Sequence, residues 1–176
     1  MSRTTCPKIL YLPIGVIRSG HTVPDQTPAQ SVYAKGCSGR AELLAEYEEG
    51  LEGLDGFSHL ILIYHFHRAQ TPQMTVTPFL HESPHGLFST RFPSRPNPIG
   101  LSIVELTRRD GTILFLDGVD VLDGTPLLDI KPYVRRFDCF VDTRDGWQDE
   151  VDEETAQRRG LRRYRSAQGT IRGKTS

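Results

Sequence analysis

Apolar and polar residues alternate in several short runs before residue 140 of this 176-residue chain. The longest run, residues 58–66, is almost wholly apolar, which predicts a strand buried on both faces. Weaker strand patterns cover residues 9–17, interrupted by a proline, and residues 39–44, 74–77 and 86–90. No helical periodicity is sustained in this part, and turn signals are frequent. The pattern therefore predicts a mainly β protein, with a barrel and a sandwich both open.

Turn residues divide these runs. Residues 99–106 and 112–116 flank an Asp-Gly pair at 110–111, and such a pair between β-rich runs predicts a hairpin. Residues 20–31 are polar and contain prolines, so we expect a loop. Residues 47–57 hold three glycines and predict one helical turn followed by a loop.

The C-terminal part differs in composition. We divide the chain into a domain of residues 1–141 and a charged tail of residues 142–176. An acidic start and an arginine-rich end would suit the macrodipole of a helix near residues 150–165. Two interpretations stay open for this tail. It is a solvated helix with a disordered end of about ten residues, or an arm that contacts RNA.

Charge and cysteine content narrow the class of partner. The formal net charge is −1, so any contact with nucleic acid must come from a local patch. The cysteines, Cys6, Cys37 and Cys139, are far apart and form no C-x-x-C pair, which argues against a zinc ribbon and favours the reducing cytoplasm. We see no signal peptide and no apolar run of membrane-spanning length, so we expect no membrane partner.

The stretch 88–102 carries polar residues on a stiff frame. Its prolines are Pro93, Pro96 and Pro98. Each proline fixes its own φ and pushes the preceding residue towards an extended conformation. Arg91, Arg95 and Asn97 are therefore held in few orientations, and a stiff loop loses less entropy when a ligand binds. This predicts a binding loop.

A second polar stretch begins with Asp-Gly-Thr-Pro at 123–126, a sequence typical of a tight turn. Asp129 and Lys131 then alternate with apolar residues, so one face of a strand is charged. That face is either the rim of a site or a structural ion pair. His65 and His67 share a strand face, but no third ligand is fixed by spacing, so we expect a hydrogen-bonded or ligand-lining role and no metal.

Common catalytic motifs are missing from this sequence. It has no G-x-G-x-x-G, no P-loop and no G-x-S-x-G elbow. The residues alone thus indicate a β-rich domain with a rigid polar loop and a carboxylate turn, without naming a reaction.

Several segments together nevertheless match a known family in order and spacing. They are residues 57–60, 66–67, 89–91, 94–102 and 122–133. Between about residues 14 and 138 the chain resembles the TsaA-like family, also called YaeB or TrmO. The resemblance implies a single compact β-barrel with short helical segments that binds S-adenosylmethionine without a Rossmann fold. It also implies a homodimer that methylates N6 of threonylcarbamoyladenosine next to the tRNA anticodon. A module that binds the cofactor without methyl transfer is the alternative.

The resemblance also implies which residues contact the cofactor. They are Pro24, Asp25, Gln26, Phe66, His67, Arg91, Leu101, Asp123, Gly124, Thr125 and Pro126. Arg91 would pair with the methionine carboxylate, and backbone groups of residues 123–126 would read the adenine edge. Arg95 and Asn97 stay open between substrate contact and anchoring of the loop.

The resemblance leaves the proton acceptor unassigned. Because an exocyclic adenine amine is a weak nucleophile, an acceptor for its proton would help, and Asp129 and Asn97 are candidates. The first loop departs from the Pro-Arg-Gln of many bacterial members, because Asp25 stands at the arginine position. Some bacterial members carry a further C-terminal domain, and only about 35 residues follow the matched region here, so RNA recognition through such a domain is not carried over.

Overall fold

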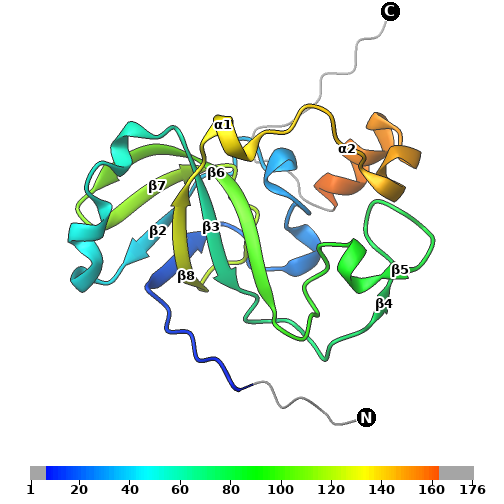
Figure 1. Ribbon diagram of the computed structural model, residues 1–176, viewed down its shortest axis with the longest axis horizontal. Coiled ribbons are helices and arrows are strands. Elements are labelled where there is room, and N and C mark those ends of the chain that lie inside the picture. The colour runs from blue at the N-terminus through cyan, green and yellow to red at the C-terminus, as the bar shows by residue number, and fades with distance from the viewer. Residues whose placement is uncertain (1–6, 163–176) are drawn as a thin grey trace, which may run out of the picture.

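Six strands of the protein close into an antiparallel barrel in the order β1-β2-β7-β6-β3-β8 (Figure 1). The computed structural model describes residues 7–162. The barrel strands are β1 (Gly15–Ser19), β2 (Gly39–Leu43), β3 (His59–His65), β6 (Ile99–Asp110), β7 (Ile113–Asp117) and β8 (Thr125–Pro132). The predicted mainly β fold is confirmed, and of the two architectures left open by the sequence the structure has the barrel. Cys6 and the predicted disordered end lie outside the described residues.

Short elements surround the barrel. Strands β4 (Thr75–Val76) and β5 (His85–Gly86) form a separate two-stranded sheet. The α-helices are α1 (Arg135–Asp138) and α2 (Glu153–Leu161). The 3-10 helices are η1 (Pro24–Gln26), η2 (Ser31–Tyr33), η3 (Ala45–Leu51), η4 (Leu54–Gly56), η5 (Leu87–Ser89) and η6 (Gly146–Glu150). Figure 1 shows β4, β5 and α2 on the same side of the barrel.

Strand β6 is the longest strand of the barrel and divides its length between two neighbours. Its first half pairs with β3, from Ile99 to Glu105, and its second half pairs with β7, from Glu105 to Asp110. A register shift between Leu106 and Arg108 marks the corner, as bulges do where a sheet bends. The closed ladder leaves no barrel strand with an unpaired edge.

The barrel core comes from one face of each strand. In β3, Leu60, Leu62 and Tyr64 are buried, whereas Ile61 and Ile63 are only partly buried. The expectation that this strand is buried on both faces is therefore wrong. An antiparallel barrel buries its inner face and leaves the outer face in contact with solvent or loops.

Two other local expectations changed. The first strand begins at Gly15, and residues 9–12 before it are exposed and form no ladder. The strand expected over 86–90 is mostly the 3-10 helix η5. Its hydroxyls bond to nearby carbonyls, Ser89 Oγ to Gly86 O and Thr90 Oγ1 to Leu87 O, both at 2.8 Å. Such local bonds offer the backbone an alternative to a sheet.

The predicted hairpin and C-terminal helix are present. Strands β6 and β7 pair up to Asp110 and Ile113, and Gly111 has φ of +57° at the turn. Helix α2 lies inside the expected range and is capped by Asp152, whose Oδ1 accepts from Thr155 N at 2.8 Å. Within residues 7–162, no helix combines the length and the apolar character needed to cross a membrane.

Candidate functional site

The loop of residues 20–31 contacts both polar stretches singled out in the sequence. Arg91 Nη1 donates to Gln30 Oε1 at 2.6 Å. Asp123 N donates to His21 O at 2.7 Å. The proline-stiffened loop and the Asp-Gly-Thr-Pro turn, distant in sequence, therefore meet across this one segment.

The end of strand β3 contacts the same two stretches. Phe66 N donates to Pro98 O at 2.7 Å, which fixes the strand end against the proline loop. His67 Nδ1 lies 3.3 Å from Thr125 Oγ1 in the turn. Burial lowers the pKa of His67, and the neighbouring Arg68 lowers it further, which favours the neutral imidazole.

The Asp-Gly-Thr-Pro turn is tied to the end of β1. Ser19 N donates to Asp123 Oδ1 at 3.1 Å, and Gly124 N donates to Ile17 O at 2.9 Å. Gly124 has φ of +76°, a conformation that favours glycine. Pro126 is the second residue of β8. The turn therefore presents its backbone from a fixed position.

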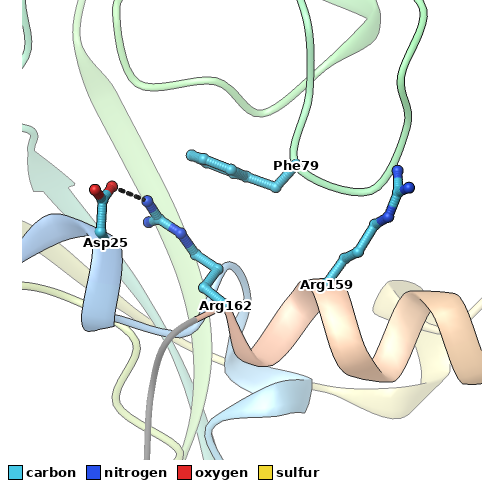
Figure 2. A pocket seen from close by; sticks show the side chains of 4 residues that line it. All are labelled: Asp25, Phe79, Arg159 and Arg162. Carbon is cyan, nitrogen blue, oxygen red and sulfur yellow. Dashed lines mark hydrogen bonds and ion pairs between the residues drawn. The ribbon is translucent and has the colours of Figure 1, made fainter.

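Residues 24–26 form the 3-10 helix η1. Pro24 starts it, and Thr27 N donates to Pro24 O at 3.2 Å. The Asp25 side chain is 69% exposed and accepts a hydrogen bond at 2.9 Å from Arg162, a residue just beyond α2. Figure 2 shows this pair at the edge of a cleft of about 340 Å³ that Phe79 and Arg159 also line.

Arg95 anchors the proline loop. Its Nη1 donates to Thr90 O at 2.9 Å and reaches Leu87 O and Phe92 O at 3.4 Å. This favours anchoring over substrate contact. Asn97 is exposed, and its carbonyl accepts from Ile99 N at 2.8 Å, so its side-chain role stays a prediction.

Asp129 forms the ion pair that the sequence left as an alternative. Lys131 Nζ lies 2.7 Å from Asp129 Oδ2, and both side chains are about half exposed. Among the contacts of residues 7–162, none joins Asp129 to Arg91 or to His67. Its proposed role as proton acceptor stays a prediction.

Leu101 stands apart from the other predicted contacts. It lies on the outer face of β6 and is 47% exposed, whereas its neighbours Gly100 and Ser102 are buried. Ile99 and Ile103 share this face, each 39% exposed. The three side chains form an apolar stripe on the outside of the barrel.

The sequence analysis missed a hydrogen-bonded chain that joins the buried Tyr64 and Ser102 to the partly buried Asp120. Ser102 Oγ donates to Asp120 Oδ1 at 2.5 Å and lies 2.9 Å from Tyr64 Oη. Serine has a single hydroxyl proton, so Tyr64 donates to Ser102. Burial raises the pKa of Asp120 to about 6, while its bond from Ser102 and the positive charge of Arg91 oppose that rise.

The sequence held a signal for this chain. Asp120 stands between the buried Val119 and Val121, and Ser102 takes an inward position of β6 between Gly100 and Val104. Buried polar groups need hydrogen-bond partners, so the sequence predicts that Asp120 and Ser102 each bond to another polar group. Only the barrel shows that they satisfy one another.

His81, in the loop between β4 and β5, contacts His85, the first residue of β5. His81 Nδ1 and His85 Nε2 are 2.9 Å apart, and Trp147 stacks on His85 with centroids 4.8 Å apart. Across residues 7–162, no group of three or more His, Cys, Asp or Glu side chains has the arrangement of a metal site.

Residues 16–139 match the family model described as the tRNA-methyltransferase O N-terminal domain. The chain belongs to this family. A member from Pyrococcus abyssi, named a probable S-adenosyl-L-methionine-binding protein, is 52% identical over 139 residues, which are 79% of this chain and 76% of that protein. The human protein named tRNA (adenine(37)-N6)-methyltransferase is 35% identical over 137 residues, covering 74% of this chain and 31% of its own length.

A solved structure of the tRNA-methyltransferase O family has the same fold. The crystal structure of TrmO from Pseudomonas aeruginosa matches with a TM-score of 0.68 and 39% identity. The match covers 80% of this chain and 62% of the other. The chain thus spans less than two thirds of that solved structure and about a third of the human relative. Helix α2 lies beyond the residues that the family model matches.

Proposed function

We propose that this protein is an S-adenosylmethionine-dependent methyltransferase that acts on tRNA. The observation that carries the proposal is the meeting of Arg91, His67 and the turn of residues 123–126 around the loop of residues 20–31. These segments carry most of the residues that the family resemblance assigns to the cofactor, and they come from four parts of the chain.

The residues present suit this cofactor. Arg91 is exposed and uses one amino group on Gln30, which leaves donors for a carboxylate. The turn of residues 123–126 offers backbone groups from a fixed position, which can read an adenine edge. The bound cofactor would supply a methyl group on a positively charged sulfur. The protein contributes chiefly alignment, because in-line displacement depends most on proximity and orientation.

The substrate we propose is threonylcarbamoyladenosine next to the anticodon. In this reaction a methyl group supplied by the bound cofactor would replace the N6 proton, which would have to pass to an acceptor. Asp129 and Asn97 are candidates for this acceptor.

A homodimer is part of the proposal. The apolar stripe of Ile99, Leu101 and Ile103 supports it, because contiguous exposed apolar residues mark interaction surfaces. A partner on this stripe would cover Leu101 and bring that residue into a site. The cytoplasmic location stays a prediction.

The test uses purified protein, labelled S-adenosylmethionine and tRNA that carries threonylcarbamoyladenosine. Nucleoside mass spectrometry should find the gain of one labelled methyl group on that nucleoside, and none on tRNA without the threonylcarbamoyl group. Methylation of both tRNAs would retain the enzyme and reject the substrate. Without a methylated product the methyltransferase proposal fails.

The second candidate is a module that binds the cofactor without transferring its methyl group. The name of the Pyrococcus abyssi relative, which mentions binding alone, favours it. Calorimetry that detects cofactor binding, combined with no methylation of bulk tRNA, would select this candidate.

A further inference from the structure

Helix α2 holds the loop that carries Asp25 by three contacts. Gly160 O accepts from Ala29 N at 2.8 Å. Arg162 Nη2 donates to Asp25 Oδ1 at 2.9 Å, and its Nη1 lies 3.5 Å from Thr27 O. All three contacts fall on the loop of residues 20–31, within or just after the 3-10 helix η1.

The Arg162 side chain is enclosed although it is charged. It is 14% exposed, and its guanidinium carbon lies 3.9 Å from the centroid of the Phe79 ring (Figure 2). Burial lowers the pKa of Arg162, and Asp25 opposes this, so the guanidinium stays charged. A charged group is kept in such a place only when partners compensate for its lost hydration, and Asp25 is that partner.

The backbone at Arg162 also indicates a specific role for its side chain. This residue has φ of +56°, and no other non-glycine residue within 7–162 has a positive φ. Such a conformation costs free energy in every residue except glycine. Glycine is the residue that most often follows the end of a helix. An arginine at this position pays the free-energy cost that glycine would avoid, and its contacts with Asp25 and Phe79 offset that cost.

Helix α2 also lies very close to η2, the 3-10 helix that follows η1 in the chain. A methyl group added at Gly160 would lie 2.6 Å from Cγ of Tyr33, closer than real contacts allow. The close approach sets the distance between α2 and the loop that η1 and η2 share. The helix therefore docks in one position.

We propose that α2 is a positioning element of the candidate site, and that Arg162 acts through Asp25 to fix η1 in the conformation that binds the cofactor. Only the last step, binding at η1, rests on the proposed function. A loop that is ordered before the ligand arrives loses less entropy on binding. Removal of the guanidinium should therefore loosen the loop and weaken cofactor binding about tenfold.

The first experiment tests the loop itself, without cofactor. In Arg162→Gly the backbone at the helix end is relieved while the side chain is lost. Hydrogen exchange should become faster at the amides of Gln26 and Thr27, which bond to Val23 O and Pro24 O. Arg158→Ala, at an exposed position of the same helix, is the matched control and should leave these amides unchanged. Equal exchange in Arg162→Gly and the unchanged protein would overturn the proposal.

The second experiment measures S-adenosylmethionine binding by calorimetry. Arg162→Gly and Asp25→Arg should each bind about tenfold more weakly, and the exchange of both charges, Asp25→Arg with Arg162→Asp, should recover most of the loss. If the unchanged protein binds the cofactor and Arg162→Gly binds it equally well, the positioning role is wrong. If the unchanged protein does not bind S-adenosylmethionine at all, the proposed function fails. The hydrogen-exchange experiment then still decides whether Arg162 orders the loop.

Discussion

Arg162 and Asp25 form an ion pair at 2.9 Å although 137 positions separate them in the sequence. The pair joins the C-terminal helix to the first polar loop of the barrel domain. The same loop also receives Arg91 through Gln30. The loop of residues 20–31 thus connects α2 with the proline-stiffened loop. A substitution at Arg162 should therefore alter the conformation near Arg91, and the reverse.

Gly160→Ala should destabilise the protein, although alanine is the better helix former. In an open helix position the change would stabilise by about 0.5–1 kcal/mol. Here the added methyl group meets the Tyr33 ring, so α2 must shift, and we expect a net loss of about 1–3 kcal/mol. Urea unfolding measures it. Gly50→Ala, where nothing lies within 4 Å of the added atom, is the control, and a gain of stability at Gly160 would contradict the packing.

Ser102→Ala should cost more stability than Tyr64→Phe. The first change leaves both the Tyr64 hydroxyl and the Asp120 carboxylate without their shared partner, and each unsatisfied buried group costs about 1–3 kcal/mol. The second change removes a single donor and should cost about 1 kcal/mol. Thermal and urea unfolding of both variants test this order, and equal losses would mean that the chain does not act as a unit.

Asp120→Asn should change how stability depends on pH. The folded-state pKa of Asp120 is raised from 3.8 to about 6, so the folded protein binds the proton more tightly than the unfolded chain does. The contribution of this group to the free energy of unfolding therefore falls as pH rises from about 4 to about 6, and stays low above that range. The asparagine variant removes this dependence.

The measurement for Asp120 is the difference in unfolding free energy between the variant and the unchanged protein. It should shift in favour of the variant between pH 4 and pH 7, by at most about 3 kcal/mol. Asp129→Asn, in a half-exposed surface ion pair, is the control for loss of a surface carboxylate. A pH-independent difference at Asp120 would mean that its carboxyl group titrates normally.

Arg91→Ala should weaken S-adenosylmethionine binding if this arginine pairs with the methionine carboxylate. A charge-assisted pair contributes about 1.5–3 kcal/mol, which corresponds to a loss of affinity of roughly 10- to 150-fold. Gln30→Ala should give a smaller loss, because Gln30 bonds to Arg91 and is not itself among the proposed cofactor contacts. Calorimetry decides, with the exposed Arg136→Ala in α1 as control. Unchanged affinity would remove Arg91 from the cofactor site.

Gly100→Ala tests how the barrel supports Phe66. The added methyl group would lie 2.6 Å from Cζ of Tyr64 and 2.8 Å from Cζ of Phe66, so both rings must move. We expect a loss of about 1–3 kcal/mol in stability from overpacking, together with weaker cofactor binding. Unfolding and calorimetry on the same variant separate the two effects. Full stability with full affinity would show that the rings adjust freely.

Local chemistry explains why some elements were predictable. The Asp-Gly hairpin between β6 and β7 and the capped helix α2 each depend on residues close in sequence, so their patterns could be read directly. The strand expected over residues 86–90 failed for a local reason too, because serine and threonine hydroxyls there compete for the carbonyls.

The sequence by itself determined the mainly β character, most strand positions, the stiff proline loop and the family, because these depend on local propensity and on motifs in order. Only the tertiary structure decided that the six strands close into a barrel, that Ser102 links Tyr64 to Asp120, and that Arg95 anchors its own loop. It alone brought Arg162 to Asp25. Such contacts join residues far apart in the chain, and the position of each partner is set by packing of the whole barrel rather than by the residues nearby.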